Sequence, residues 1–197
     1  AVRMGANAVY LGADIFSARG NAGNFNREQL LEAVKYRHAR NVAVHLACNT
    51  LIHDDEMESA LNLIKYACEI GIDAIIIQDI GLVSLIRKAA PNMTLHASTQ
   101  MSVHTAEAAK MLYDMGFERV VLARELSKTE IKEIADKLKS MNCPIELEVF
   151  VHGALCMSVS GQCYMSAMLG GRSGNRGLCA QPCRLPFNAG GNGHDLS

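Results

Sequence analysis

The sequence predicts an α/β fold in which parallel βα repeats form a partial TIM-type barrel. An internal repeat supports this: a glycine, a small or apolar residue, a polar residue and an apolar run occur at 5–10, 71–76 and 116–121. A glycine that ends a helix before a short buried strand produces this pattern. Strands that alternate with helices imply a parallel sheet. The predicted strands are Ala8–Leu11, Val42–Asn49, Ala74–Gln78, Thr94–Thr99, Val120–Ala123 and Ile145–Val151.

Helices are expected between these strands. The stretch Ser127–Glu130 has the spacing of a capping box, and it opens a helix with Ile131, Ile134 and Leu138 on its inward face. Pro91 is expected to end the helix that precedes it. The apolar faces expected before the second and third glycines consist of Met57, Leu61, Ile64 and Cys68, and of Ala108, Met111, Leu112 and Met115.

The number of strands decides between two architectures. A complete TIM barrel has eight strands, whereas six are predicted, and almost no helix precedes the first copy of the repeat. We therefore expect an incomplete barrel, with a helix and a strand lying before Ala1. An open doubly wound sheet is the alternative, but no glycine-rich dinucleotide motif follows any strand. Residues 1–152 would form the barrel-like domain, 153–187 a cysteine- and arginine-rich segment, and 188–197 a flexible tail.

Composition narrows the function classes. Of 197 residues, 49% are hydrophobic and 20% are charged, and the formal net charge is -1. This balance excludes a broad basic surface for nucleic acid, so any anion site must be local. No apolar run has the length of a membrane span, and no signal peptide is recognisable. We expect a cytoplasmic protein without membrane contact, whose clustered cysteines serve metal or redox chemistry rather than disulfides.

The strongest chemical signal is a group of four cysteines, Cys156, Cys163, Cys179 and Cys183, in one loop-rich stretch. Thiolates bind soft metals, and several thiolates from one loop can surround an iron–sulfur cluster. Zinc is the alternative, because Cys179 and Cys183 fit a zinc knuckle, but the wide spacing of Cys156 and Cys163 favours iron–sulfur. Packing as small buried residues is less favoured, since a core does not require clustering. The remaining cysteines are expected to be core or incidental residues: Cys48, Cys68 and Cys143.

A longer string contains the first of these cysteines. The stretch Glu148–Cys156, with Gly161, Cys163 and Ser166 after it, resembles the signature of peptidase family U32. That signature is Glu-x-Phe-x-x-Gly-x-x-Cys, then Gly-x-Cys, then Ser. The glycine-rich and cysteine-containing stretches that follow are also similar to this family, and more so to members that modify ribosomal RNA than to those that modify tRNA. The resemblance covers essentially the whole chain, and full-length members extend further at both ends.

The resemblance implies two competing activities. The family was classified as collagenase-like peptidases, which act on peptides. Several members are oxygen-independent hydroxylation proteins of RNA or of small aromatic ubiquinone precursors, and these carry a 4Fe–4S cluster on four cysteines. By motif, Cys156, Cys163 and Cys179 are the implied ligands, and the fourth is Cys183 or a residue beyond this chain. A third possibility is a non-catalytic scaffold partner that binds a structural metal.

Candidate catalytic residues lie at strand ends, because the carboxyl ends of the strands hold the active site in TIM barrels. Arg124 and Glu125 follow one strand directly, and His152 follows another. The alternative for the charged pair is an ion pair at the barrel rim. His152 and Cys156 could form the Cys/His pair of a peptidase, but a metal-bound cysteine is no free nucleophile. The sequence lacks both the His-Glu-x-x-His and the Gly-x-Ser-x-Gly motifs.

Three arginines flank the cysteines: Arg172, Arg176 and Arg184. Interleaved with glycines, they would bind phosphate or carboxylate through guanidinium groups and backbone N–H groups. The alternative is that they balance the charge of metal-bound thiolates. His45 and His96 lie among apolar strand residues and are expected to be core histidines with hydrogen-bond partners.

Overall fold

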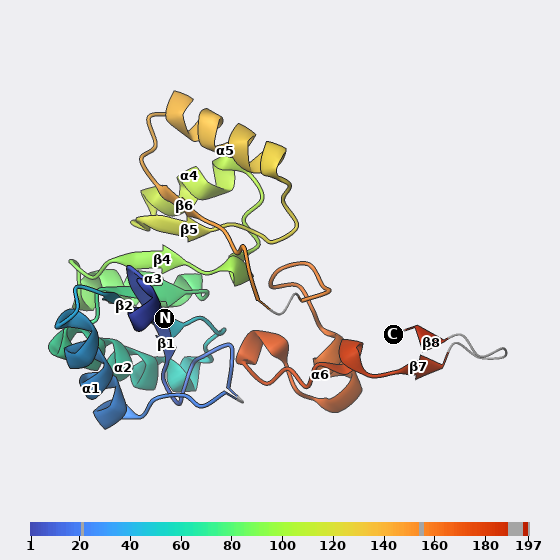
Figure 1. Ribbon diagram of the computed structural model, residues 1–197, viewed down its shortest axis with the longest axis horizontal. Coiled ribbons are helices and arrows are strands. Elements are labelled where there is room, and N and C mark those ends of the chain that lie inside the picture. The colour runs from blue at the N-terminus through green and yellow to red at the C-terminus, as the bar shows by residue number, and fades with distance from the viewer. Residues whose placement is uncertain (21, 154–155, 189–194, 197) are drawn as a thin grey trace.

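The computed structural model describes residues 1–20, 22–153, 156–188 and 195–196. Six parallel strands form one sheet in chain order, and the sheet curves into a half-barrel with helices on its convex side (Figure 1). All six predicted strands, and the incomplete barrel, are therefore confirmed. The strands are β1 Ala8–Gly12, β2 Ala43–Cys48, β3 Ala74–Ile77, β4 Leu95–Ala97, β5 Arg119–Val121 and β6 Glu146–Glu148.

Four of the α-helices begin where a side chain caps their free N–H groups. Asn26 and Ser127 each form a complete capping box, as expected for Ser127, while Asp79 and Thr105 cap with one hydrogen bond. Pro91 follows the end of α3, as predicted. The helices are α1 Arg27–His38, α2 Met57–Ile70, α3 Ile80–Ala89, α4 Ala106–Asp114, α5 Lys128–Ser140 and α6 Met165–Gly170. The short 3-10 helices are η1 Val2–Met4, η2 Asp54–Glu56, η3 Thr99–Met101, η4 Gly174–Arg176 and η5 Pro182–Arg184.

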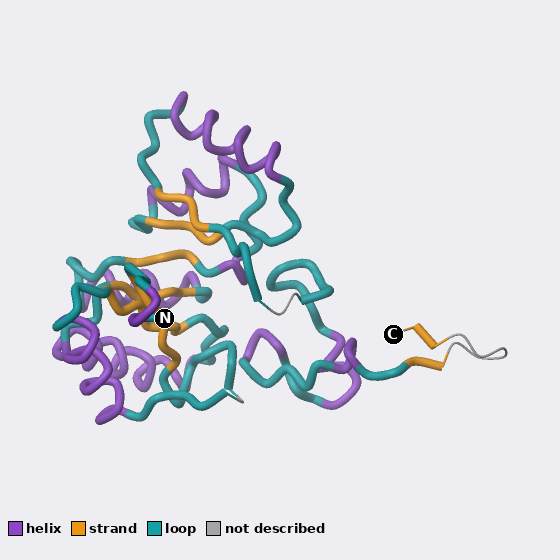
Figure 2. The backbone as a smooth tube through the Cα atoms, viewed as in Figure 1, coloured by secondary structure: helices purple, strands orange, loops and turns teal. Residues whose placement is uncertain are grey.

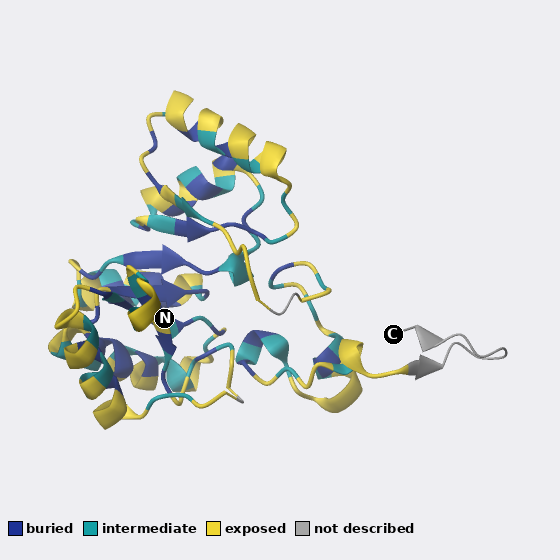
Figure 3. Cartoon of the chain, in the orientation of Figure 1, coloured by how far each residue is buried: buried dark blue, intermediate teal, exposed yellow. Residues whose placement is uncertain are grey.

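The core fills the space between the sheet and the helices. Alternate residues of each strand face the helices; in β2 these are Val44, Leu46 and Cys48, all fully buried. Phe117, just before β5, is also fully buried. Figure 3 shows the middle strands of the sheet and the inner faces of the helices as the buried part of the molecule, whereas β6 is partly exposed.

In two helices, most of the expected inward-facing residues pack against the core, but one in each helix does not. In α2, Ile64 is buried as predicted, but Cys68 is exposed, and the buried stripe includes Ala60 and Ala67. In α4, Met111 has 55% of its surface exposed. In both helices the buried face contains alanines beside large apolar residues: Ala60 and Ala67 beside Leu63 and Ile64 in α2, and Ala106 and Ala109 beside Leu112 in α4.

The segment after β6 is mostly loop, as Figure 2 shows, but it is more structured than the sequence suggested. It contains α6, η4 and η5, and after these β7 (Phe187–Asn188) pairs antiparallel with β8 (Asp195–Leu196). The expected flexible tail falls mainly on 189–194 and 197, which lie outside the described residues. Within the described residues, no helix has the length and apolar character needed to cross a membrane.

Candidate active site at the carboxyl ends of the strands

The loops after β4 and β5 form one end of the half-barrel. Ser98 follows β4, and its hydroxyl accepts a hydrogen bond from Gln100 N as η3 begins. Thr99 Oγ1 donates to Leu122 O at 3.2 Å, which joins this loop to the end of β5. These contacts place the 98–104 loop beside Arg124, which follows β5.

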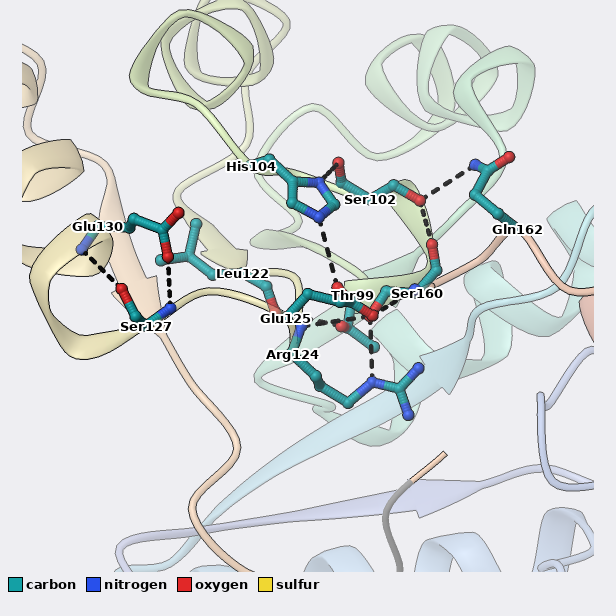
Figure 4. A network of polar contacts seen from close by, with 10 residues as sticks. All are labelled: Thr99, Ser102, His104, Leu122, Arg124, Glu125, Ser127, Glu130, Ser160 and Gln162. Atoms are coloured by element: carbon teal, nitrogen blue, oxygen red, sulfur yellow. Dashed lines mark hydrogen bonds and ion pairs between the residues drawn. The ribbon is translucent and has the colours of Figure 1, made fainter. Parts of the chain in front are cut away.

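Ser160 connects the cysteine-rich segment to this end of the barrel (Figure 4). Its side chain is fully buried, and its hydroxyl donates to Glu125 Oε1 at 3.1 Å. The same hydroxyl accepts from Arg124 N at 3.3 Å and from Arg124 Nε at 3.1 Å. Ser160 N donates to Glu125 Oε1 at 2.7 Å. Arg124 and Glu125 therefore share one buried serine.

Glu125 is held as a carboxylate by these contacts. Partial burial acts to raise its pKa, but hydrogen bonds from its own N–H and from Ser160, together with the charge of Arg124, lower the pKa below its ordinary value. His104 Nε2 lies 3.4 Å from Glu125 Oε2. His104 Nδ1 lies 2.7 Å from Ser102 O, and because a carbonyl only accepts, Nδ1 donates there. An imidazole and a carboxylate thus face each other beside Arg124.

Ser102, in the loop after β4, also contacts the cysteine-rich segment. Its hydroxyl donates to Ser160 O and accepts from Gln162 Nε2 at 3.1 Å. Figure 4 shows Ser102, Ser160 and Gln162 in one connected network with His104. The network joins residues from two loops of the barrel to one stretch of the cysteine-rich segment.

Arg124 retains binding capacity. Its Nε and its backbone N–H are used by Ser160, but in the described part of the chain no hydrogen bond or ion pair involves Nη1 or Nη2. Figure 4 shows these nitrogens pointing away from His104 and Ser102. A guanidinium group held at one nitrogen and free at the other two suits a phosphate or a carboxylate.

Sequence reasoning found part of this site. It singled out Arg124 and Glu125, and the structure brings them together. It missed Ser160, Ser102 and His104. The one available signal was that Ser160 precedes the first glycine of the Gly-x-Cys string. His152, the third predicted catalytic residue, is exposed in the stretch after β6. The catalytic roles of these residues stay predictions.

The four clustered cysteines are all free thiols. Cys156 and Cys183 are exposed, whereas Cys163 and Cys179 are partly buried. The donor chemistry suits an iron–sulfur cluster or zinc. The arrangement does not, because among the described residues no three or more His, Cys, Asp or Glu side chains are placed to hold a metal ion. We therefore derive no reaction step from a metal.

All three predicted substrate arginines interact with other groups of the protein. Arg176 forms a bidentate ion pair with Glu56, with both N–O distances at 2.6 Å, and Nη1 also donates to Leu51 O. The paired side chains are 25% and 29% exposed. Arg172 Nε donates to Leu178 O at 3.1 Å, and Arg184 is exposed on η5. Glu56, which sequence reasoning did not single out, thus attaches η4 to the start of α2.

The concave face of the sheet is also polar. Tyr10 on β1 donates to Glu148 on β6 at 2.8 Å, so a side-chain contact joins the two outermost strands. Arg119 Nη1 donates to the other oxygen of Glu148 at 3.2 Å. Burial and the neighbouring carboxylate raise the pKa of Tyr10 to about 12, so the phenol stays protonated and donates.

His45 and His96 are buried on this face, and their rings meet edge to face with centroids 4.7 Å apart. The expected hydrogen-bond partners are absent for Nδ1 of both within the described residues, which corrects the prediction. Their neighbours on β3, Ala74 and Ile76, offer no side-chain acceptor. Burial and then the charge of Arg119 lower the pKa of His45; burial, His45 and Arg119 lower that of His96 to about 3.

A cavity of about 600 Å³ lies elsewhere, at the start of α1 and α2. It shares no lining residue with the Ser160 network, and its lining includes Asp14, Asp55 and Glu58. Three carboxylates outnumber the one arginine of the lining, Arg27, so this cavity does not suit an RNA backbone.

The fold and this strand-end site are those of a TIM-barrel-like α/β protein with a cysteine-rich segment. The pattern of peptidase family U32 matches residues 1–195, and the chain belongs to that family. A solved U32 peptidase structure shares the fold, with a TM-score of 0.62 and 17% identity over 77% of this chain and 62% of that one.

Curated relatives carry names for different activities. The 23S rRNA 5-hydroxycytidine synthase of Escherichia coli (strain K12) is 44% identical over 95% of this chain and 27% of its own length. The tRNA hydroxylation protein P of the same organism is 37% identical over 95% and 41%. The Collagenase of Porphyromonas gingivalis (strain ATCC BAA-308 / W83) is 35% identical over 95% and 46%. The chain thus spans less than half the length of these relatives.

Proposed function

We propose that this chain is part of an enzyme that hydroxylates RNA bases, with ribosomal RNA as its substrate class. The observation that supports this most directly is the 44% identity, over 95% of the chain, to a relative named for making 5-hydroxycytidine in 23S rRNA. Relatives named for tRNA hydroxylation are 35% to 39% identical to this chain over the aligned residues, so the favoured substrate is ribosomal.

In this proposal the strand-end network binds and orients the substrate. The free nitrogens of Arg124 would bind a phosphate or a substrate carboxylate. Glu125, held ionised by Ser160, would accept a proton or a hydrogen bond from the base, with His104 as its neighbour. The buried hydroxyl of Ser160 would keep both groups at fixed positions, which catalysis requires.

A collagenase-type peptidase is the second candidate, because one relative carries that name. The Ser160 network does not favour it. Ser160 is fully buried, and its hydroxyl contacts a carboxylate rather than the imidazole that activates a serine nucleophile. A peptidase mechanism would have to use other residues, such as His152 with Cys156.

We also propose that Cys156, Cys163, Cys179 and Cys183 hold a 4Fe–4S cluster, with zinc as the alternative. Four free thiols in one short segment support this assignment. Binding would require the segment to rearrange so that the thiols converge. The cluster would supply redox chemistry that side chains lack. A third candidate, a non-catalytic partner with a structural metal, keeps the cysteines but needs no role for Arg124.

The test is a nucleoside analysis of ribosomal and transfer RNA from cells that lack the protein. We expect a hydroxylated pyrimidine to disappear from ribosomal RNA and to return with the wild-type gene. Glu125→Gln and Arg124→Lys should fail to restore it, whereas Glu133→Gln, a change of an exposed glutamate on α5, should restore it fully. Unchanged RNA together with collagen cleavage by the purified protein would favour the peptidase.

A further inference from the structure

Two glycines precede cysteines with the same spacing, in Gly161-Gln162-Cys163 and Gly177-Leu178-Cys179. We propose that Gly161 and Gly177 are docking joints, by which loops of the barrel fix the positions of the Cys163 and Cys179 thiols. The proposal concerns the metal-free protein and does not depend on the RNA-hydroxylation function.

The first joint lies on the loop after β4. Gly161 has a φ of 73°, in the left-handed region. A Cβ added there would lie closer than 3.0 Å to Gln100 O and 2.7 Å from Gln100 C. These are backbone atoms, so they cannot move aside as a flexible side chain would. The hydrogen bonds of Ser160 and Gln162 flank this contact on both sides.

The second joint lies on the loop between β1 and α1. Gly177 has a φ of 76°, and a Cβ there would lie closer than 3.0 Å to Ser17 O. Gly20 N donates to Gly177 O at 3.0 Å, and a Cβ on Gly20 would lie 2.8 Å from that oxygen. The ion pair of Arg176 with Glu56 holds the chain just before this contact.

A third glycine in the segment shows that these contacts are specific. Gly171 ends α6 with a φ of 67°, close to the values at Gly161 and Gly177. A Cβ on Gly171 would meet no atom within 4 Å. Gly171 is therefore required by backbone conformation alone, whereas the two joint glycines are required by conformation and by contact with the barrel.

The exposure of the thiols differs between cysteines near the joints and cysteines away from them. Cys163 and Cys179, two residues after the joints, are partly buried, whereas Cys156 and Cys183 are exposed. Because the joints are 16 residues apart in sequence and rest on different loops, each should control its own thiol.

The experiment is thiol alkylation of the full-length metal-free protein, followed by mass spectrometry of each cysteine. Gly161→Ala should raise the alkylation rate of Cys163 about tenfold, which corresponds to ~1.4 kcal/mol in the docking equilibrium. Gly177→Ala should do the same for Cys179 and leave Cys163 unchanged. Gly171→Ala, which introduces the same backbone strain into open space, should change neither rate. Buried Cys48 reports in each sample whether the barrel stays folded.

The proposal would be overturned if the alkylation rates of Cys163 and Cys179 were the same in Gly161→Ala, Gly177→Ala and Gly171→Ala. It would also be overturned if both rates rose equally in either joint variant. If Cys48 becomes reactive in a joint variant, Ser160→Ala provides the milder test, because it removes hydrogen bonds of the first joint and adds no atom. It should raise the rate at Cys163 alone; an unchanged rate there refutes the first joint. Loss of RNA hydroxylation in cells is a separate result, since alkylation uses neither metal nor RNA.

Discussion

In residues 8–148, apolar side chains from strands and helices pack into one continuous core, whereas 156–188 contacts the barrel through hydrogen bonds, one ion pair and glycine backbone. The segment leaves large apolar side chains in solvent: Met168 is 84% exposed and Leu169 is 68% exposed. In the barrel, Phe117 and Ile75 are fully buried. Full burial of a large apolar side chain stabilises the folded state by about 1.5–3 kcal/mol relative to leaving it exposed.

This difference indicates two levels of stability in one chain. A region with few buried apolar contacts opens locally at low free energy, while the core opens only with global unfolding. The residues with candidate chemistry lie where the two regions meet. Glu125 and Arg124 belong to the stable barrel, and Ser160 brings the less stable segment to them.

The largest expected effect concerns the proposed metal. Replacement of Cys156, Cys163 or Cys179 by Ala should each remove most of the iron and acid-labile sulfide from protein prepared without oxygen. The barrel should remain folded, because these thiols lie outside its core. Cys48→Ser, a change in the core, should reduce stability but not the iron content per folded molecule. Full iron retention in all three variants would exclude these ligands.

The next largest effect separates the core from the segment. Phe117→Ala should lower the free energy of unfolding by about 3–5 kcal/mol, because it leaves a cavity in a close-packed core. Leu169→Ala, on the exposed face of α6, should change it by less than about 0.5 kcal/mol. Urea unfolding followed by far-ultraviolet circular dichroism measures both. Similar losses from the two changes would show that the segment is packed as firmly as the barrel.

The sequence predicted the barrel well for a physical reason. A buried strand must be apolar over consecutive residues, and a helix end must be capped locally, so the six strands and the Ser127 cap are encoded within a few residues. The choice of helix face was less predictable. Met111 is more hydrophobic than Ala109, yet Ala109 is buried and Met111 is exposed, because the buried face of α4 is the one that carries Ala106, Ala109 and Leu112.

The candidate site was less predictable because its contacts join distant residues. Ser160 lies 35 positions after Glu125, and Arg176 lies 120 positions after Glu56. No periodic pattern links such residues. The motif around Gly161 marked the segment as chemically important, but the contact that requires a glycine there becomes visible only when Gln100 O lies against it.

A smaller effect depends on pH. The hydrogen bonds from Arg176, and then that from His53 N, lower the pKa of Glu56 to about 2. A lowered folded-state pKa stabilises the docked form above the ordinary value of about 4.3, and this contribution is lost as pH falls toward 2. The Leu51 amide, which donates to Asn175 O across the contact, reports docking by hydrogen exchange.

The protection factor of Leu51 should therefore be constant above pH 5 and fall between about pH 4.3 and 2. Glu56→Gln should lower it about fivefold at pH 7, as expected for ~1 kcal/mol, and should abolish the fall. Glu58→Gln, an exposed neighbour on α2, is the matched control and should retain the wild-type profile. A wild-type profile in Glu56→Gln would show that the ion pair does not hold η4 in place.

The change expected to affect folding least is a substitution of Arg172, and it tests this arginine as a substrate-binding group. Its Nε has one hydrogen bond, to Leu178 O, and its side chain lies on the exposed segment. Arg172→Ala should therefore change the free energy of unfolding by less than about 0.5 kcal/mol. If Arg172 contacts a phosphate, RNA binding should weaken, and the slope of log K against log salt should decrease by about 1.

Arg3→Ala removes the same charge from the exposed η1 and should leave the slope unchanged. Arg172→Lys keeps the charge but loses the planar fork, so it should retain the salt slope while binding less tightly. Equal slopes for Arg172→Ala and Arg3→Ala would assign Arg172 to the structure of the segment and leave Arg124 as the candidate anion-binding arginine.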